Sequence, residues 1–505
     1  MNLSPPYIGA IDQGTTGTRF VVFDTNGVPM GDGFVAHEQS LYPPNRVEYD
    51  AMEIWECTRA AIQEGLDRAR IDYDQLATIG IANQRQTTVV WDDEGEPVAP
   101  AQSWQDRRAS ELLGEIDSEA ADRIRTRTGL TIDPYFAGPK LAWLLDRETY
   151  RGRPLRDVAE AGDVYFGTID SWLLTKLTGR HLTDITNASQ TLLYNVTDRE
   201  WDDALLDRFD IPRAMLPTVL PSADPTGYGT TDVGGLLEGE IPVTGVIGNQ
   251  HAALVGQAGF DVGDTKVSYG SGNFALQHVG TQPVESGSSL LTTIWFQQAG
   301  DSPCYGLEGP IFTTGTALEW LEQIGVLPEQ GSLIGTDAPL DPDNQTIVIP
   351  TIGGGGSLDW RFSGGMITDV TRFSTGTDIV RGAIDGIGFA TRTILDMIER
   401  ASEMEIESIS VDGGAITDDA FAARQAALIG RRLVRGAVSQ TSALGASFTA
   451  GLGADIWSDR TELQEDWQAG RSFEPHGTEV VSERYDRWLT VARETGDLSE
   501  RSARR

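Results

Sequence analysis

The stretch "YIGAIDQGTTGTRFVVFD" (residues 7–24) decides the fold of this chain. It is typical of an apolar strand, a turn of glycine and threonine, and a second strand. The stretch "DTKVSYGSGNFALQHVG" (residues 264–280) repeats the strand, the glycine–hydroxyl turn and the strand about half a chain later. Two copies of one unit predict two domains that are built on the same plan.

The rest of the chain alternates strands with helices. Apolar residues recur at helical spacing over residues 51–70 and 378–404, whereas residues 76–100 and 241–250 have the pattern of strands. Such alternation indicates an α/β protein. Because 505 residues are too many for one ordinary core, we expect one domain over residues 1–255 and another over residues 256–505.

The chain is strongly acidic, with 75 acidic residues against 39 basic ones and a formal net charge of −36. Three of the basic residues are lysines (Lys140, Lys176 and Lys266), and the acids are scattered along the chain. This excess opposes nucleic-acid binding, because phosphate contacts need a basic surface. A salt-loving host explains both the acidity and the scarcity of lysine, since molar salt shortens the screening length to ~3 Å. An acidic protein of no special habitat is the alternative.

Composition gives no indication of a membrane, secreted or metal-cluster protein. No run of ~18 apolar residues could span a bilayer, and the N-terminus enters a strand pattern without a signal peptide. The two cysteines, Cys57 and Cys304, provide neither a disulfide framework nor a metal-ligand spacing. We therefore expect a cytoplasmic protein.

Three turns have the chemistry of a nucleotide site. In "DQGTTGTR" (residues 12–19), backbone N–H groups can cradle phosphate, Thr15 and Thr16 can donate from hydroxyls, and Asp12 can hold a hydrated divalent cation. The turn "SYGSGN" (residues 268–273) could grip the same polyphosphate from the other domain, and "SVDGGAITDD" (residues 410–419) could receive a base and ribose. Plain turns that need glycine for positive φ are the alternative.

Other segments carry side chains suited to hydroxyl groups. Arg85 and Gln86 stand at a strand junction, and "SWQDRR" (residues 103–108) and "DPYFAGPK" (residues 133–140) add Trp104 and Tyr135. Together they suit a ligand that carries hydroxyl groups, with aromatic walls against its C–H groups. The alternatives are an ion-pair role for Arg85 and core packing for the two aromatic residues. The stretch "GVIGNQHAALVGQ" (residues 245–257) delivers two amides, Asn249 and Gln250, from the end of a strand.

These segments resemble, in order and along essentially the whole chain, the FGGY family of carbohydrate kinases, and within it the glycerol kinases. The likeness lies in "IDQGTTGTRFVVFD", "IANQRQTTVVW", "SWQDRR", "TDITNASQTLLYN", "GNQHAALVGQ", "SYGSGNF", "VDGGA" and "SALGASFTAGL". The resemblance implies two actin-like (ribonuclease H-like) ATPase domains, each a mixed sheet flanked by helices, with an interdomain cleft over ATP and a polyol. It also implies ATP and Mg²⁺ as cofactors, and a homodimer or homotetramer.

The resemblance also implies site residues at matching positions. Position 249 is the catalytic position, Asp12 is the carboxylate that holds magnesium through water, and Arg19 acts beside the phosphates. The nucleotide-binding positions are Thr15, Thr16, Gly17, Arg19, Ser271, Gly315, Thr316, Glu319, Gly414 and Asp418. The polyol-binding positions are Arg85, Gln86, Trp104, Tyr135, Asn249, Gln250 and Phe274.

The sequence departs from the family pattern at the centre of this site. The family has a general-base aspartate at position 249 and, in glycerol kinases, a glutamate at 86, where this chain has Asn249 and Gln86. The usual amides at 319 and 418 are Glu319 and Asp418. An amide keeps the hydrogen bond to a hydroxyl but cannot take its proton. Asp12 or Asp106, acting through a water, would be a substitute.

Three hypotheses follow from these residues. The first is ATP-dependent phosphorylation of glycerol to sn-glycerol 3-phosphate. It stays physically reasonable because the loose transition state of phosphoryl transfer depends mainly on positioning and charge stabilisation. The second is a non-catalytic or regulatory paralogue that binds nucleotide or polyol. The third is a kinase for another small polyol or triose, such as dihydroxyacetone.

Overall fold

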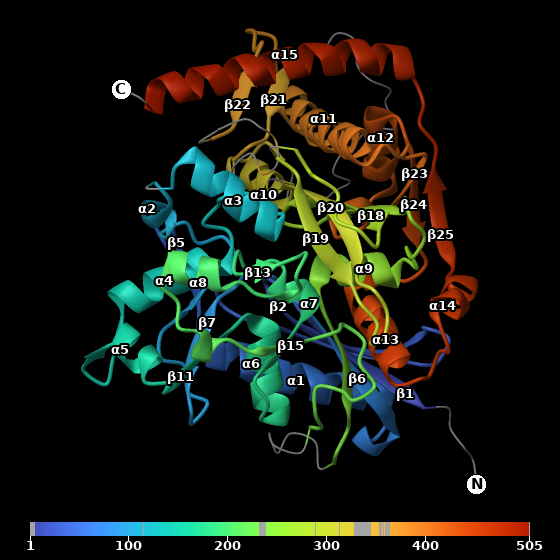
Figure 1. Cartoon of the computed structure of the whole chain (residues 1–505). Coiled ribbons are helices and arrows are strands. Elements are labelled where there is room, and N and C mark those ends of the chain that lie inside the picture. The colour runs from blue at the N-terminus through green and yellow to red at the C-terminus, as the bar shows by residue number, and fades with distance from the viewer. Residues whose placement is uncertain are drawn as a thin grey trace.

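The structure is a computed structural model that describes residues 6–503 apart from 115, 232–238, 288, 313, 328–344, 353–355, 357 and 359–363. Of residues 466, 478, 479 and 495–503 it describes the backbone alone. Within these residues, two large mixed β-sheets are packed with helices (Figure 1). The predicted α/β class with two mixed sheets is confirmed, and the domain boundary near residue 255 stays a prediction.

The first sheet has the strand order β16-β6-β1-β2-β3. Its strands are β1 (Tyr7–Gln13), β2 (Gly17–Phe23), β3 (Pro29–Ala36), β6 (Leu76–Asn83) and β16 (Val243–Gly248). β16, β6 and β1 run parallel, whereas β2 and β3 are each antiparallel to the strand before. The predicted hairpin pairs Asp12 with Arg19 in register, so both residues lie at the same end of the sheet.

The second sheet repeats this plan. Its order is β19-β20-β18-β17-β23-β24-β25. Its strands are β17 (Thr265–Tyr269), β18 (Asn273–Gly280), β19 (Leu291–Phe296), β20 (Cys304–Ile311), β23 (Ser408–Asp412), β24 (Arg432–Gly436) and β25 (Ala469–Phe473). The inner run β24-β23-β17-β18-β20 has the same parallel and antiparallel pairings as β16-β6-β1-β2-β3. The doubling predicted from the two strand–turn–strand units is therefore present in the topology.

Helices pack on both sheets. The helix α1 (Ala51–Ala69) packs on β2 and β3, and Asp50 caps its first turn by accepting from the N–H groups of Met52 and Glu53. The other helices are α2 (Ser110–Leu113), α3 (Ser118–Thr128), α4 (Ala137–Arg147), α5 (Leu155–Glu160), α6 (Ile169–Thr178), α7 (Ile185–Ala188), α8 (Asp203–Phe209), α9 (Asn249–Gly256), α10 (Gly315–Gln323), α11 (Gly376–Ser402), α12 (Asp419–Ile429), α13 (Thr441–Gly453), α14 (Arg460–Asp466) and α15 (Thr478–Ala503).

Short strands form the remaining pairings. They are β4 (Ser40–Tyr42), β5 (Arg46–Tyr49) and β8 (Ala101–Gln102) in one sheet, and the pairs β7 (Val89–Asp92) with β11 (Val164–Gly167), β9 (Thr149–Tyr150) with β10 (Arg153–Pro154), β12 (Leu182–Asp184) with β15 (Thr218–Leu220), β13 (Tyr194–Asn195) with β14 (Glu200–Trp201), and β21 (Ile347–Ile349) with β22 (Met366–Thr368).

The helix α13, from the second half of the chain, packs on α9 and on β1, β6 and β16 of the first sheet (Figure 1). Glycine allows this close approach. A Cβ at Gly445 would lie 1.8 Å from the carbonyl oxygen of Ala252, and one at Gly80 would lie 2.1 Å from that of Ala446. The small-residue pattern "SALGASFTAGLG" (residues 442–453) thus brings the two halves together beside the start of α9.

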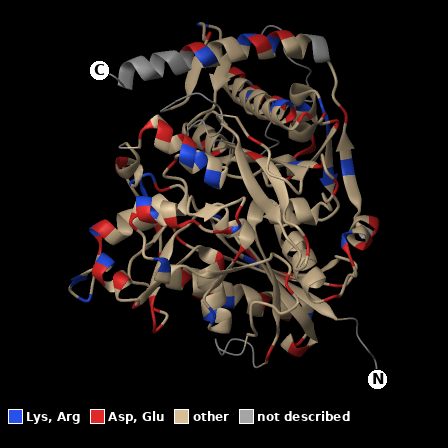
Figure 2. Cartoon of the chain, viewed as in Figure 1, with Lys and Arg blue, Asp and Glu red and all other residues tan. Residues whose placement is uncertain are grey.

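Acidic residues are spread over the elements of both halves (Figure 2). Within the described part of the chain, no helix has the length and apolar character that a membrane crossing needs. Arginines form ion pairs at the surface, such as Arg123 with Glu119 on α3. Because an exposed pair contributes little, these pairs do not cancel the repulsion of a chain with a net charge of −36.

Salt is therefore expected to stabilise the protein. Raising KCl from ~0.1 M to ~1 M shortens the screening length from ~10 Å to ~3 Å. Relief of a few kcal/mol of repulsion corresponds to a rise of roughly 5 °C in the unfolding midpoint of a chain of this size. Thermal unfolding followed by circular dichroism measures this rise, with sucrose at matched water activity as the uncharged control. Equal midpoints at both KCl concentrations would contradict it.

Candidate active site

A cavity of about 340 Å³ lies where the two strand–turn–strand units meet. The residues that line it are Asp12, Arg19, Gln250, Ser268, Gly270, Asp412, Gly413, Ser439, Gln440, Thr441 and Ser442. Asp12 and Arg19 come from β1 and β2, whereas Ser268, Gly270 and Asp412 come from β17, its turn and β23. The structure thus brings residues from both predicted phosphate segments to one cavity, although Thr15, Thr16, Gly17 and Ser271 are not among its lining residues.

Two carboxylates and a guanidinium give this cavity its charge. Burial raises the pKa of Asp12 to about 6, with Arg19 opposing the rise and Asp412 adding to it. Burial also raises the pKa of Asp412, against the nearby ammonium of Lys266. Arg19 forms an ion pair with Asp32, and its guanidinium carbon lies 5.0 Å from the centre of the Phe34 ring.

These groups fit a hydrated Mg²⁺, which prefers one or two carboxylates together with substrate phosphates. Asp412 was not among the predicted residues. Its place at the end of a strand, directly before two glycines, was the available signal in "SVDGGAITDD".

The first phosphate turn is held from several sides. The Gly14 N–H donates to the Gly17 carbonyl at 2.9 Å, and the Tyr49 hydroxyl donates to the Thr15 carbonyl at 3.0 Å. The indole N–H of Trp104 donates to the Thr15 Oγ1 at 3.1 Å. This last bond joins the predicted phosphate turn to a predicted polyol residue.

The second turn lies against the start of α10. The N–H groups of Gly315 and Thr316 donate to the carbonyl oxygens of Gly270 (3.0 Å) and Ser271 (3.2 Å), so four residues of the predicted nucleotide region lie together. Glu319 is exposed further along α10.

The third turn carries the other two predicted nucleotide positions. Gly414 is exposed next to the cavity residue Gly413. The side chain of Asp418 caps α12 by accepting from the N–H groups of Ala420 (2.8 Å) and Phe421 (3.0 Å). That cap gives Asp418 a structural role, and its role in nucleotide binding stays a prediction.

Aromatic side chains from both halves form one group. The Trp104 ring centre lies 6.0 Å from that of Tyr135 and 6.4 Å from that of Phe274. Phe312, which follows β20, joins them at 5.3 Å from Tyr135 and 6.1 Å from Trp104. Phe312 was missed, because "GPIFTTG" (residues 309–315) gives no sign that its phenylalanine faces residues two hundred positions earlier.

Arg85 lies under this aromatic group in a buried ion pair with Glu308 of β20. Its Nη1 and Nη2 donate to the Glu308 oxygens at 2.7 and 2.5 Å, and the two side chains are 2 % and 1 % exposed. Burial alone would lower the pKa of Arg85, but the Glu308 carboxylate and Tyr135 leave it above its ordinary value. The guanidinium carbon lies 5.9 Å from the Phe274 ring centre, so Arg85 is both an ion-pair partner and a neighbour of the aromatic group.

Gln86 is linked to the same ion pair through Gln190. The Gln86 Nε2 donates to the Gln190 Oε1 at 2.8 Å, and the Gln190 Nε2 lies 3.4 Å from the Glu308 Oε2. Gln86 adopts a left-handed backbone with φ of 63°. Neither Glu308 nor Gln190 was predicted from the sequence.

Asn249 is the first residue of α9, directly after β16, and its carbonyl oxygen accepts from the Ser442 Oγ at 3.3 Å. Gln250 and Ser442, but not Asn249, are among the described residues that line the cavity. The Gln250 Oε1 accepts from the Nζ of Lys266 on β17. Burial lowers the pKa of Lys266 to about 8, with Asp412 and Glu308 opposing the fall.

The two carboxylates considered as a substitute base, Asp12 and Asp106, have different surroundings in the structure. Asp106 is buried and accepts from the Val47 N–H at 2.7 Å and from the Arg108 guanidinium at 2.6 Å. Asp12, by contrast, lines the cavity. Asp106 therefore has a structural role in an ion pair, and of the two carboxylates only Asp12 is among the residues that line the cavity.

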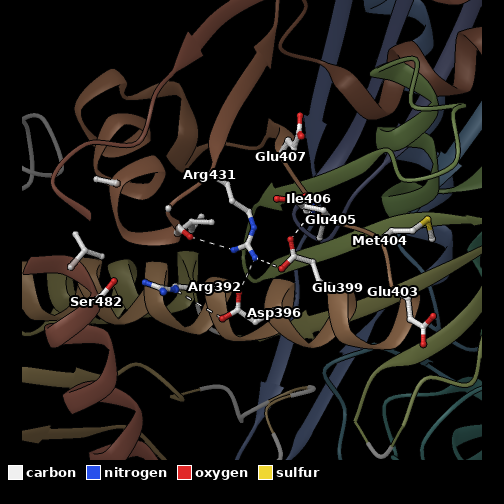
Figure 3. A pocket seen from close by; sticks show the side chains of 14 residues that line it. Arg392, Asp396, Glu399, Glu403, Met404, Glu405, Ile406, Glu407, Arg431 and Ser482 are labelled. Atoms are coloured by element: carbon white, nitrogen blue, oxygen red, sulfur yellow. Dashed lines mark hydrogen bonds and ion pairs between the residues drawn. The ribbon is translucent and has the colours of Figure 1, made fainter. Parts of the chain in front are cut away.

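A second cavity, of about 700 Å³, lies at the end of α11 and holds none of the predicted residues (Figure 3). Arg431 projects between Asp396 and Glu399 there, with its Nη2 2.8 and 2.5 Å from their oxygens. Glu403, Glu405 and Glu407 also line this cavity, so most of its charged side chains are acidic. Size alone does not make this cavity the site, because the reactive groups gather in the smaller one.

Two mixed sheets of one topology, with a charged cavity between their turns, define the class of two-domain, actin-like α/β proteins. The model of the FGGY family of carbohydrate kinases, N-terminal domain, matches residues 7–256, and that of the C-terminal domain matches residues 265–454. The chain belongs to the FGGY family of carbohydrate kinases.

Full-length relatives include glycerol kinases of halophiles. The chain is 44 % identical to the glycerol kinase of Haloferax volcanii over 491 residues, which cover 95 % of this chain and 96 % of that protein. It is 43 % identical to the glycerol kinase of Halobacterium salinarum over 496 residues, 96 % and 97 % of the two chains. The solved structure of Plasmodium falciparum glycerol kinase with ADP superposes with a TM-score of 0.86 at 27 % identity, over 97 % of this chain and 98 % of that one.

Proposed function

We propose that this chain transfers the γ-phosphoryl group of ATP to a primary hydroxyl of glycerol, giving sn-glycerol 3-phosphate. The observation that carries the proposal is the hydrogen bond from Trp104 to Thr15, which joins the predicted polyol wall to the predicted phosphate turn. The likeness to glycerol kinases, one of them solved with ADP, supports both substrates.

In this proposal the side chains act mainly by positioning and by charge. Thr15, Thr16 and Gly17 hold phosphate oxygens, and Arg19 offsets their negative charge. Asp12 and Asp412 would hold Mg²⁺, which would supply further neutralisation of the phosphate charge. Arg85 and the aromatic group orient the polyol. Asn249 holds the attacking hydroxyl without taking its proton, so we expect slow turnover.

A direct assay tests this function. Purified protein in ~2 M KCl is expected to form ADP slowly, and only when glycerol and Mg-ATP are both present. The double variant Thr16→Ala, Arg19→Met is the matched control, because it removes the proposed phosphate contacts without changing the polyol residues. Its rate of ADP formation should be at least about tenfold lower than that of the wild type. Equal rates in the two proteins would refute the proposal.

A second candidate function is a non-catalytic or regulatory paralogue, which Asn249 favours. Calorimetry that detects binding of ADP or glycerol, with no turnover in the assay above, would support it.

The third candidate is a kinase for another small polyol or triose. Gln86, which lacks the charge of the family's glutamate, favours that reading, and a panel that includes dihydroxyacetone decides it. A homodimer or homotetramer remains part of the proposal.

A further inference from the structure

The orientation of the Gln86 amide follows from a buried carboxylate. A carboxylate only accepts hydrogen bonds, so the Gln190 atom 3.4 Å from the Glu308 Oε2 must be its NH₂ group. The same NH₂ donates to the Thr293 Oγ1 at 2.9 Å. The Gln190 Oε1 therefore faces Gln86 and accepts from its Nε2 at 2.8 Å. Among the described residues no hydrogen bond to the Gln86 Oε1 is seen, so the polar atom that Gln86 can offer a ligand is this acceptor.

The orientation of the Gln250 amide follows from a buried ammonium. Lys266 donates to the Ser268 Oγ at 2.8 Å and to the Gln250 Oε1. An ammonium only donates, so the Gln250 oxygen is fixed on Lys266 and its NH₂ group is the end left for the cavity that Gln250 lines. Gln250 is thus a donor, opposite in polarity to Gln86.

We propose that Glu308 and Lys266, two buried charged residues of the second half of the chain, are positioning residues that set the hydrogen-bond polarity of the polyol site. They hold Gln86 as an acceptor and Gln250 as a donor. The matching ligand is a neutral polyol in which one hydroxyl donates to Gln86 and another oxygen accepts from Gln250. A carboxylate-bearing analogue is disfavoured, because it cannot donate to Gln86. This inference rests on the proposed polyol function.

The first test needs no ligand, so it is independent of that function. Gln86→Glu places an acceptor against the Gln190 oxygen, whereas Gln86→Met removes the hydrogen bond without adding charge. The glutamate variant is expected to unfold about 5 °C below the methionine variant in ~2 M KCl at pH 8. A Gln86→Glu variant as stable as wild type would show that Gln190 presents its NH₂ group to position 86, and would overturn the inference.

The second test measures ligand preference by calorimetry with glycerol, 1,2-propanediol, 1,3-propanediol and glycerate. Wild type should bind glycerol more tightly than it binds the other three ligands. Gln190→Met, which frees the Gln86 amide to turn, should reduce this ratio of affinities about five- to tenfold. Gln250→Glu keeps a partner for Lys266 but presents an acceptor to the cavity. It should therefore lower the affinity for glycerol more than Gln250→Met does. An unchanged preference in Gln190→Met, or equal losses in the two Gln250 variants, would overturn the inference. Failure of wild type to bind any polyol would refute the proposed function instead.

Discussion

Replacing Asn249 by aspartate is expected to raise the turnover of glycerol about 10²- to 10⁴-fold. The aspartate would take the proton of the attacking hydroxyl, and general-base help of this kind has that typical size. The variant should fold, because residue 249 is the first of α9, where a negative charge is favoured by ~0.3–1 kcal/mol. Glycerol-dependent ADP formation in ~2 M KCl measures the effect, and the affinity for glycerol should change far less than kcat.

The matched control is Asn249→Ser, which stays polar at position 249 but supplies no base. Its turnover of glycerol should be no higher than that of the wild type. If Asn249→Asp binds glycerol and ATP yet turns over no faster than wild type, the missing carboxylate is not what limits this chain. Adding Gln86→Glu should reduce the gain, because the amide of Gln86 is matched to Gln190 and a carboxylate there lacks a donor. The two departures from the family pattern are therefore not equivalent.

The sequence was sufficient to predict the repeated architecture because its signals are local. A strand that ends in "DQGTTGTR" or "SYGSGN" shows its turn and both strands within twenty residues, and the two sheets share a topology. The cavity residues Asp12, Arg19 and Gln250 came from the same local motifs and from the family resemblance.

The residues that were missed depend on long-range pairing. Glu308 meets Arg85 across 223 positions of the chain, and Gln190 lies 118 positions before Glu308. Lys266 sits on a strand like any buried residue, and only the packing of β17 against α9 brings it to Gln250. No spacing in the sequence indicates which strand faces a given side chain across a domain interface.

The ion pair between Arg85 and Glu308 is expected to have the largest effect on stability. Either Glu308→Gln or Arg85→Met should lower the free energy of unfolding by ~3–5 kcal/mol, because each leaves a buried charge without its partner. Urea unfolding at constant ~2 M KCl measures the loss. A loss below ~1 kcal/mol would show that water or a rearranged side chain replaces the missing partner.

The double variant Arg85→Met, Glu308→Leu separates stability from function. Apolar side chains of similar volume often replace a buried ion pair at little cost, so most of the lost stability should return. Glycerol binding should not return, because the guanidinium beside Phe274 and the carboxylate that orients Gln190 and Gln86 are both gone. A double variant that is stable and still binds glycerol with wild-type affinity would mean that the ion pair serves the fold alone. In that case the plain structural alternative for Arg85 would be the correct one.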